Sequence, residues 1–186
     1  MKDSTGRDAE WPAASAVILA RPHDLRSIGA IELAAARLLA GHAPDAVLDE
    51  VTDVRELRDA QQAGRLWVAI SGHVPVGFAH ADVLETGIAH LLEVDVHPDH
   101  GRQGLGTQLV KTVCTWARAE GYESLVLTTF RDVPWNMPFY LKLGFEVVPS
   151  AEWSHAMCGI VSAERRRGLD IDRRVVMRRT CDDRAA

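Results

Sequence analysis

The chain has 186 residues, 47% of them hydrophobic and 25% charged, which is enough for one folded domain with a sizeable core. The formal net charge of −5 argues against nucleic acid as the main partner, because phosphate binding needs clustered cations. Residues 1–10 are polar and contain no apolar signal core, and no apolar run reaches membrane-spanning length, so no membrane partner is expected.

Cysteine usage predicts neither a metal centre nor a disulfide framework. Cys114, Cys158 and Cys181 are widely spaced, no pair has metal-ligand spacing, and their number is odd. We therefore expect no metal ion, and a reducing, cytoplasmic location.

The first part of the chain is predicted to hold one strand and two helices. Residues 14–21 are apolar and rich in β-formers, which indicates a strand. Asp24 then suits the N-cap of a helix with apolar residues at helical spacing, which ends before Gly41. A second helical stretch covers residues 54–63.

Along the rest of the chain, stretches whose apolar residues have strand-like spacing alternate with stretches whose apolar residues have helix-like spacing. A helix begins after the glycines near residue 104 and ends at Gly121, and short connections favour an antiparallel meander before it. The strands are expected at residues 65–71, 76–83, 88–96, 124–128, 145–148 and 173–178, and the further helices at residues 134–143 and 153–167.

This order of elements predicts an α+β fold, in which a mostly antiparallel central sheet with one strand–helix–strand crossover is flanked by helices. Residues 1–13 are predicted to form a flexible arm, residues 14–180 a single domain and residues 181–186 a tail.

A glycine turn opens the long helix. Gly101, Gly104 and Gly106 lie where a helix start leaves about four backbone N–H groups unpaired and carries partial positive charge. Glycines let a phosphate approach those groups, and Arg102 adds a cation, so the turn is built like an anion cradle. It matches neither the dinucleotide fingerprint nor the nucleotide-triphosphate loop. The alternative is a connector that binds nothing.

Two motifs extend this interpretation. V-x-V-H-P-x-H-G-R-x-G-x-G before a helix, and later F-Y-x-K-L-G-F, resemble the GNAT superfamily of acetyl-CoA-dependent N-acyltransferases, most strongly over residues 76–148. The resemblance implies a GNAT-like fold, acetyl-CoA as co-substrate and acetyl transfer to a primary amine. The family often has Gln or Arg where this chain has Gly101. The resemblance implies cofactor contacts at Val94, Val96, Gly101, Arg102, Gln103, Gly104, Leu105, Gly106 and Thr107.

Tyr140, in the segment PFYLKLGF, matches the family position whose phenol lies near the cofactor sulfur, which implies a general acid. A phenol pKa of about 10 suits protonation of a thiolate whose pKa is about 8.5. The alternative role is core packing beside Phe139. Related sequences often have an Asn where Val133 stands, and Asn136 is our candidate to replace its cofactor contact.

The general base is sought on the strand IAHLLEVDV, where a carboxylate within an apolar run needs a reason. Glu93 is our candidate, acting through water, and a salt bridge on a half-exposed sheet face is its alternative. Glu93 and Asp95 are expected to face away from the side chains of Val94 and Val96, unless a bulge re-aims them. His90 is the second candidate, because an imidazole with a pKa near 6.5 is a suitable base.

The acceptor is expected to be a small-molecule amine. The resemblance implies that residues 24–63 and the segment after Val148 select it, and residues 151–170 would cover the site. A protein N-terminus or lysine is an alternative acceptor, and a non-catalytic acyl-CoA-binding sensor is an alternative function. Both a monomer and a homodimer stay open. The arginines within residues 164–168 are interpreted as a solvated helix end.

Overall fold

The computed structural model describes residues 15–181. The predicted arm at residues 1–13 lies outside them, as does the predicted tail apart from Cys181. No helix in this described part of the chain is long and apolar enough to cross a membrane.

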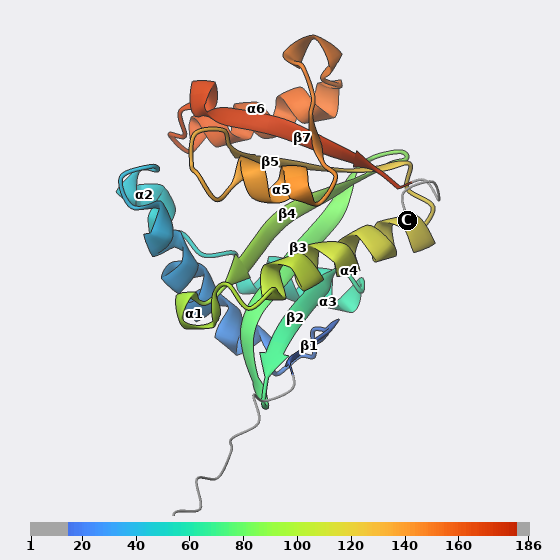
Figure 1. The fold of residues 1–186 in the computed structure, drawn as a ribbon. Helices are drawn as coiled ribbons and strands as arrows, with labels where there is room; N and C mark the ends of the chain where they lie inside the picture. The colour runs from blue at the N-terminus through green and yellow to red at the C-terminus, as the bar shows by residue number, and fades with distance from the viewer. Residues whose placement is uncertain (1–14, 182–186) are drawn as a thin grey trace, which may run out of the picture.

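Seven strands form one mixed sheet in the order β1-β2-β3-β4-β5-β7-β6 (Figure 1). Among the strands of residues 15–181, only β4 and β5 are parallel, and every other neighbouring pair is antiparallel. The expected α+β fold, with its antiparallel meander and one crossover, is therefore confirmed. The strands are β1 (Ser15–Leu19), β2 (Leu66–Ser71), β3 (Val74–Glu85), β4 (Ile88–Val96), β5 (Ser124–Phe130), β6 (Glu146–Val147) and β7 (Arg174–Thr180).

Helices cover both faces of this sheet. The helix α4 crosses in front of β3 and β4 in Figure 1, and α5 lies on the same face, whereas α1, α3 and α6 pack on the other face. The α-helices of the described residues are α1 (Leu25–Ala36), α2 (Asp45–Leu48), α3 (Val54–Gln62), α4 (Leu105–Ala119), α5 (Met137–Lys142) and α6 (His155–Arg166).

The apolar periodicity of α4 builds the main core. Leu109 and Val113 are fully buried and pack on sheet residues that include Ala89 and Leu125. On the opposite face, Ile28 of α1 joins a second buried cluster with α3 and the first strands. Burial of such side chains contributes about 1.5–3 kcal/mol each, so the two faces hold the sheet between layers of helices.

Three details differ from the sequence expectations or lie outside them. Asp24 occupies the N-cap position of α1, but its backbone is already helical and its Oδ2 accepts from the Arg21 backbone N–H at 2.9 Å instead. The short helix α2 lacks a predicted counterpart. The last strand, β7, is inserted between β5 and β6, a position that was not predicted from the sequence. That insertion depends on long-range pairing, which local periodicity does not encode.

Candidate active site

The parallel strands β4 and β5 separate partway along their length. Their pairing covers three residue pairs and ends at His90 and Val126, although both strands continue. β5 keeps its pairing with β7 as far as Phe130 and Arg174. The sheet therefore opens between the second half of β4 and β5.

The backbone polar groups of β4 are divided between its two sides. The N–H of His97 donates to the carbonyl oxygen of Val76 in β3 at 2.8 Å. Because these groups alternate along a strand, Asp95 also turns its backbone groups toward β3, and Val94 and Val96 turn theirs into the opening. The split thus exposes main-chain donors and acceptors at the two positions that the sequence singled out.

A β-bulge fixes which side chains share a face. His80 is opposite Glu93 and Ala81 is opposite Leu91, so Leu92 is the extra residue. Leu91 lies in the α4-side core, and Val94 and Val96 pack against that same core. The bulge shifts the alternation by one, and Glu93 consequently faces away from α4, as the sequence predicted for Glu93 and Asp95.

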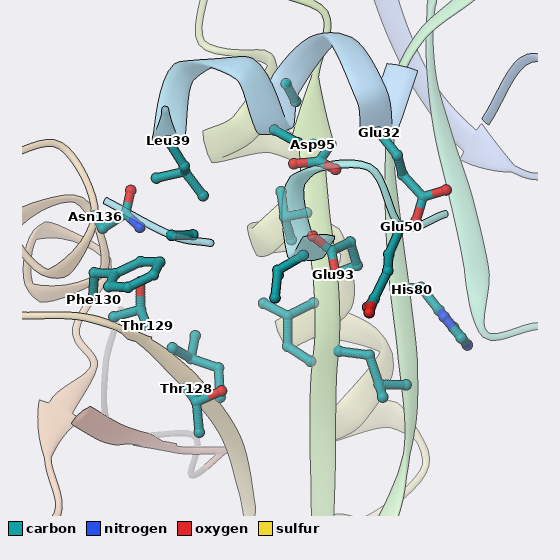
Figure 2. Close-up of a pocket in the computed structure, with 18 of the residues that line it drawn as sticks. Glu32, Leu39, Glu50, His80, Glu93, Asp95, Thr128, Thr129, Phe130 and Asn136 are labelled. Atoms are coloured by element: carbon teal, nitrogen blue, oxygen red, sulfur yellow. The ribbon is translucent and has the colours of Figure 1, made fainter. Parts of the chain in front are cut away.

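A pocket of about 590 Å³ occupies the opening. Its lining comes from both faces of the sheet, because α1, α3 and α6 contribute from one side, and Gly106 of α4 and Tyr140 of α5 from the other. Figure 2 shows Glu32, Glu93 and Asp95 on one side of the pocket, with threonines of β5 and Asn136 opposite. The pocket therefore connects the start of α4 with the face that carries the first helices.

Two carboxyl groups of β4 hold protons unusually tightly. Burial raises the pKa of Glu93 from 4.5 to about 7, with a smaller contribution from Glu32. Burial and the neighbouring Glu93 raise the pKa of Asp95 well above its usual range. Glu93 nevertheless has an exposed surface, which opens into the pocket. Glu93 therefore combines contact with the pocket and a protonation equilibrium near neutral pH.

Tyr140 lies on the α4 side of the pocket. Its ring makes edge contacts with Phe139 and Phe145, at centroid distances of 5.0 and 5.7 Å. Burial, followed by the charges of Glu93 and Asp95, raises the pKa of the phenol, so it stays protonated. Tyr140 thus combines core packing with a position on the pocket wall.

The glycine turn has an unusual backbone. Gly104 and Arg102 both have positive φ, 81° and 58°, and α4 begins immediately afterwards at Leu105. Gln108 N–H donates to the carbonyl of Gly104 at 3.0 Å, so the N–H groups of the preceding helical residues have no intrahelical acceptor. A Cβ on Gly104 would meet nothing within 4 Å. This turn leaves room for an anion before the helix.

The pocket gathers several of the predicted site residues but not all. Its lining includes Glu93, Gly106 and Tyr140, and also Val94, Val96 and Asn136. His90 is not among the lining residues, and burial lowers its pKa to about 4. The turn residues Gly101, Arg102, Gln103, Gly104, Leu105 and Thr107 lie outside the lining and precede or begin α4.

Sequence reasoning missed a buried polar network beside the pocket. The Arg174 guanidinium donates to Glu164 Oε1 at 2.6 Å, and Thr128 Oγ1 donates to the same oxygen at 2.5 Å. The Glu164 side chain is only 9% exposed, so the interpretation of this segment as a solvated helix end is wrong for Glu164. Arg165, Arg166 and Arg167 are all exposed, and Arg167 also forms an ion pair with Glu50.

Glu32 is the second residue without a predicted role. It is 7% exposed, and its carboxylate accepts from the Thr52 hydroxyl at 2.6 Å and from the Thr52 backbone N–H at 3.2 Å. In the sequence, Glu32 could have been singled out only as an acidic residue among the apolar positions of α1. That signal was weak, because the capturing Thr52 lies 20 residues away.

Comparison with known proteins gives one family. The model of the Acetyltransferase (GNAT) family matches residues 33–145, more than half of the chain. N-acetyltransferase 8F1 of Rattus norvegicus is 34% identical over 88 residues, which are 45% of this chain and 40% of that protein. The chain spans less than half the length of the curated relatives that it matches.

Solved structures have the same fold. PaiA N-acetyltransferase from Thermoplasma acidophilum, in complex with coenzyme A, has a TM-score of 0.70 and 14% identity, covering 90% of this chain and 99% of that one. The ribosomal-protein-S18-alanine N-acetyltransferase from Escherichia coli has a TM-score of 0.62 and 17% identity, covering 93% and 99%. At these identities the likeness concerns the fold alone.

Proposed function

Because this chain belongs to the GNAT acetyltransferase family, we propose that it transfers an acetyl group from acetyl-CoA to a primary amine of a small molecule. The observation that carries this proposal is the pocket through the split between β4 and β5. It joins exposed main-chain groups and a helix start on one side to a wall of carboxylates on the other.

The turn before α4 fits a pyrophosphate. Unpaired N–H groups at a helix start favour an anion, and Gly104 has no side chain and no neighbouring atoms that would block the approach. Val94 and Val96 then offer backbone groups along the split for the pantetheine arm and the acetyl carbonyl. When bound, acetyl-CoA supplies an acetyl thioester, from which the carbon–sulfur bond breaks as the carbon–nitrogen bond forms.

Glu93 is the proposed general base. A free alkylammonium has a pKa of about 10, so the acceptor must lose a proton before its nitrogen can attack. Burial holds the pKa of Glu93 at about 7, which leaves a substantial fraction of carboxylate at neutral pH and a stronger base than an ordinary glutamate. Glu93 takes the amine proton through a water molecule.

Tyr140 is the proposed acid on the other side. Its raised pKa keeps the phenol protonated over the working pH range, so it always has a hydrogen to offer. Complete transfer to a thiolate with a pKa of about 8.5 is uphill, and Tyr140 therefore acts mainly by hydrogen bonding to the departing sulfur. His90 is less well supported as a base, because its pKa of about 4 makes it a poor proton acceptor.

Contacts around the pocket favour a small acceptor over a protein. Arg167 Nε donates to Glu50 Oε2 at 2.8 Å, and Arg173 Nη1 donates to the His42 carbonyl at 2.9 Å. These bonds tie the segment after α1, which lines the pocket, to the C-terminal part of the chain. A protein N-terminus or lysine would need this side to be open.

A thiol-release assay with acetyl-CoA and a panel of amines tests the proposal. We expect free thiol to appear with at least one small primary amine, together with the N-acetylated product by mass spectrometry. Acetyl-CoA binding without turnover of any small amine would contradict it and favour the sensor alternative. Turnover confined to peptides would favour a protein acceptor.

A further inference from the structure

The pocket wall carries an excess of acidic side chains, of which Glu93 and Asp95 have raised pKa values and hold their protons more tightly than usual. Seven carboxylates line it, against two arginines and one histidine. Both arginines are already paired, Arg174 with Glu164 at 2.6 Å and Arg167 with Glu50 at 2.5 Å. The histidine, His80, is buried, and its burial lowers its pKa, so it adds no compensating charge. The carboxylates are Glu32, Glu50, Asp53, Glu56, Glu93, Asp95 and Glu164.

Four of these carboxylates have no lysine or arginine at ion-pair distance within residues 15–181. Glu93 and Asp95 follow the bulge of β4, and Glu32 and Glu56 project from α1 and α3. The basic atom near the Glu56 carboxylate is Nδ1 of His80, which lies 4.0 Å from Glu56 Oε1. Glu32 is buried and Asp95 is half-buried, whereas Glu93 and Glu56 expose their side chains on the pocket wall. Four carboxyl groups without a cationic partner in one pocket attract a cationic ligand.

Glu32 is fixed before anything binds. Its carboxylate oxygens accept from Thr52, as described above, and the side chain is 7% exposed. Its charge helps to raise the pKa of Glu56, Glu93 and Asp95, so its field reaches all three. A preorganised charge of this kind contributes to binding without first having to be ordered.

Apolar side chains lie along the same pocket. Leu39, Val47 and Val51, which follow α1 in the chain, line it beside the carboxylates. An aliphatic stem fits such a wall, with charged groups at its ends. A carboxylate on the acceptor would meet no unpaired arginine here, and the acidic wall would repel it.

We propose that the acceptor is a linear aliphatic diamine or polyamine, with its reacting amine beside Glu93 and Asp95 and its second cationic group beside Glu32 and Glu56. This inference rests on the proposed acetyl transfer for its catalytic meaning, although the binding itself is measurable without turnover.

Binding to the enzyme saturated with free coenzyme A, which cannot donate an acetyl group, tests the inference. Three ligands of matched length are titrated by calorimetry: 1,4-diaminobutane, 1-aminobutane and 4-aminobutanoate. We expect the diamine to bind at least tenfold more tightly than the monoamine, the amino acid to bind most weakly, and the diamine preference to fall with added salt.

Charge-removing variants locate the second cation. Glu32→Gln retains a carbonyl oxygen for the Thr52 donors, and we expect it to lower the diamine preference about fivefold or more. Glu56→Gln, on a different helix, gives the same test if Glu32→Gln fails to fold. Glu146→Gln is the matched control, because Glu146 is exposed on β6 outside the pocket.

Equal affinity for the diamine and the monoamine, no measurable diamine binding, or tighter binding of a basic peptide would each overturn the inference. Thiol release measured with the same ligands separates its failure from that of the proposed function. If monoamines are acetylated as well as diamines, the proposed diamine acceptor is wrong but the proposed acetyl transfer stands. If the diamine binds tightly but no thiol is released, the diamine-binding site stands but the proposed acetyl transfer is wrong.

Discussion

Gly77 in β3 lies so close to the carbonyl oxygen of Asp95 in β4 that a Cβ on Gly77 would come within 2.8 Å of it. The opposing atom belongs to the backbone, so it cannot move without displacing the strand. We expect Gly77→Ala to lower the free energy of unfolding by about 1–3 kcal/mol in urea titrations, and to weaken acetyl-CoA binding as β4 shifts.

Gly159→Ala in α6 is the control for this substitution. A Cβ there meets nothing within 4 Å and its φ is not positive, so alanine is expected to be neutral or stabilising by up to about 1 kcal/mol. Equal stability of Gly77→Ala and the parent protein would show that the two strands are not packed as tightly as described.

Removal of the Tyr140 hydroxyl is predicted to slow catalysis without loss of cofactor binding. The Tyr140→Phe variant keeps the ring contacts with Phe139 and Phe145 but has no proton to offer the departing sulfur. We expect kcat to fall by roughly ten- to a thousandfold with an unchanged Kd for coenzyme A. An unaltered kcat would remove Tyr140 from the mechanism.

A carboxylate in the glycine turn is predicted to repel the pyrophosphate. Gly104→Asp places negative charge at the start of α4, and we expect a loss in acetyl-CoA affinity of about tenfold or more by calorimetry. Gly104→Asn is the matched control, because it meets the same positive φ of 81° without the charge. Identical affinities of these two variants would argue against an anion site here.

The raised pKa of Glu93 makes stability depend on pH. The unfolded chain releases this proton near pH 4.5 and the folded chain near pH 7, so the folded state binds it more tightly. The free energy of unfolding should therefore fall as pH rises between these values. The whole loss caused by ionising Glu93 is present above pH 7. The charges facing this carboxyl are Asp95, Glu32, Glu164, Arg167 and Arg174.

Glu93→Gln removes this titration. We expect the variant to be more stable than the parent in urea at pH 8 and to lose that advantage at pH 4, where the parent is protonated. In activity assays kcat/KM of the parent should rise with pH through about 7, and the variant should lack this rise. A variant advantage that does not change with pH would contradict the assignment.

The pair of Glu164 and Arg174 is predicted to be strongly coupled. Their side chains are only 9% and 12% exposed, so removal of one partner leaves the other charge poorly solvated. We expect Glu164→Leu to cost about 3 kcal/mol of unfolding free energy, and the double variant with Arg174→Met to cost less than the sum of the single ones. Additive costs in this cycle would show that the pair is not coupled.

The sequence by itself determined the features that depend on neighbouring residues. Alternating and helical periods predicted β4 and α4, and the glycines at their junction predicted the turn, because side-chain direction and φ are local properties. The resemblance carried by the motif around Tyr140 implied a place near the cofactor sulfur; Tyr140 lies on the pocket wall, and its catalytic role stays a prediction. The sequence also predicted that Glu93 and Val94 face opposite sides of the sheet, because successive side chains alternate along a strand.

Only the tertiary structure decided how distant segments complete the pocket. β4 and β5 part after His90 and Val126 while β5 stays paired with β7 as far as Phe130, and neither pairing has a local signal in the sequence. Arg167 meets Glu50 across 117 residues of sequence, and Thr128 meets Glu164 across 36. Which carboxylates are paired and which remain for a ligand is set by such long-range contacts, because charge and burial depend on spatial neighbours rather than on neighbours in the chain.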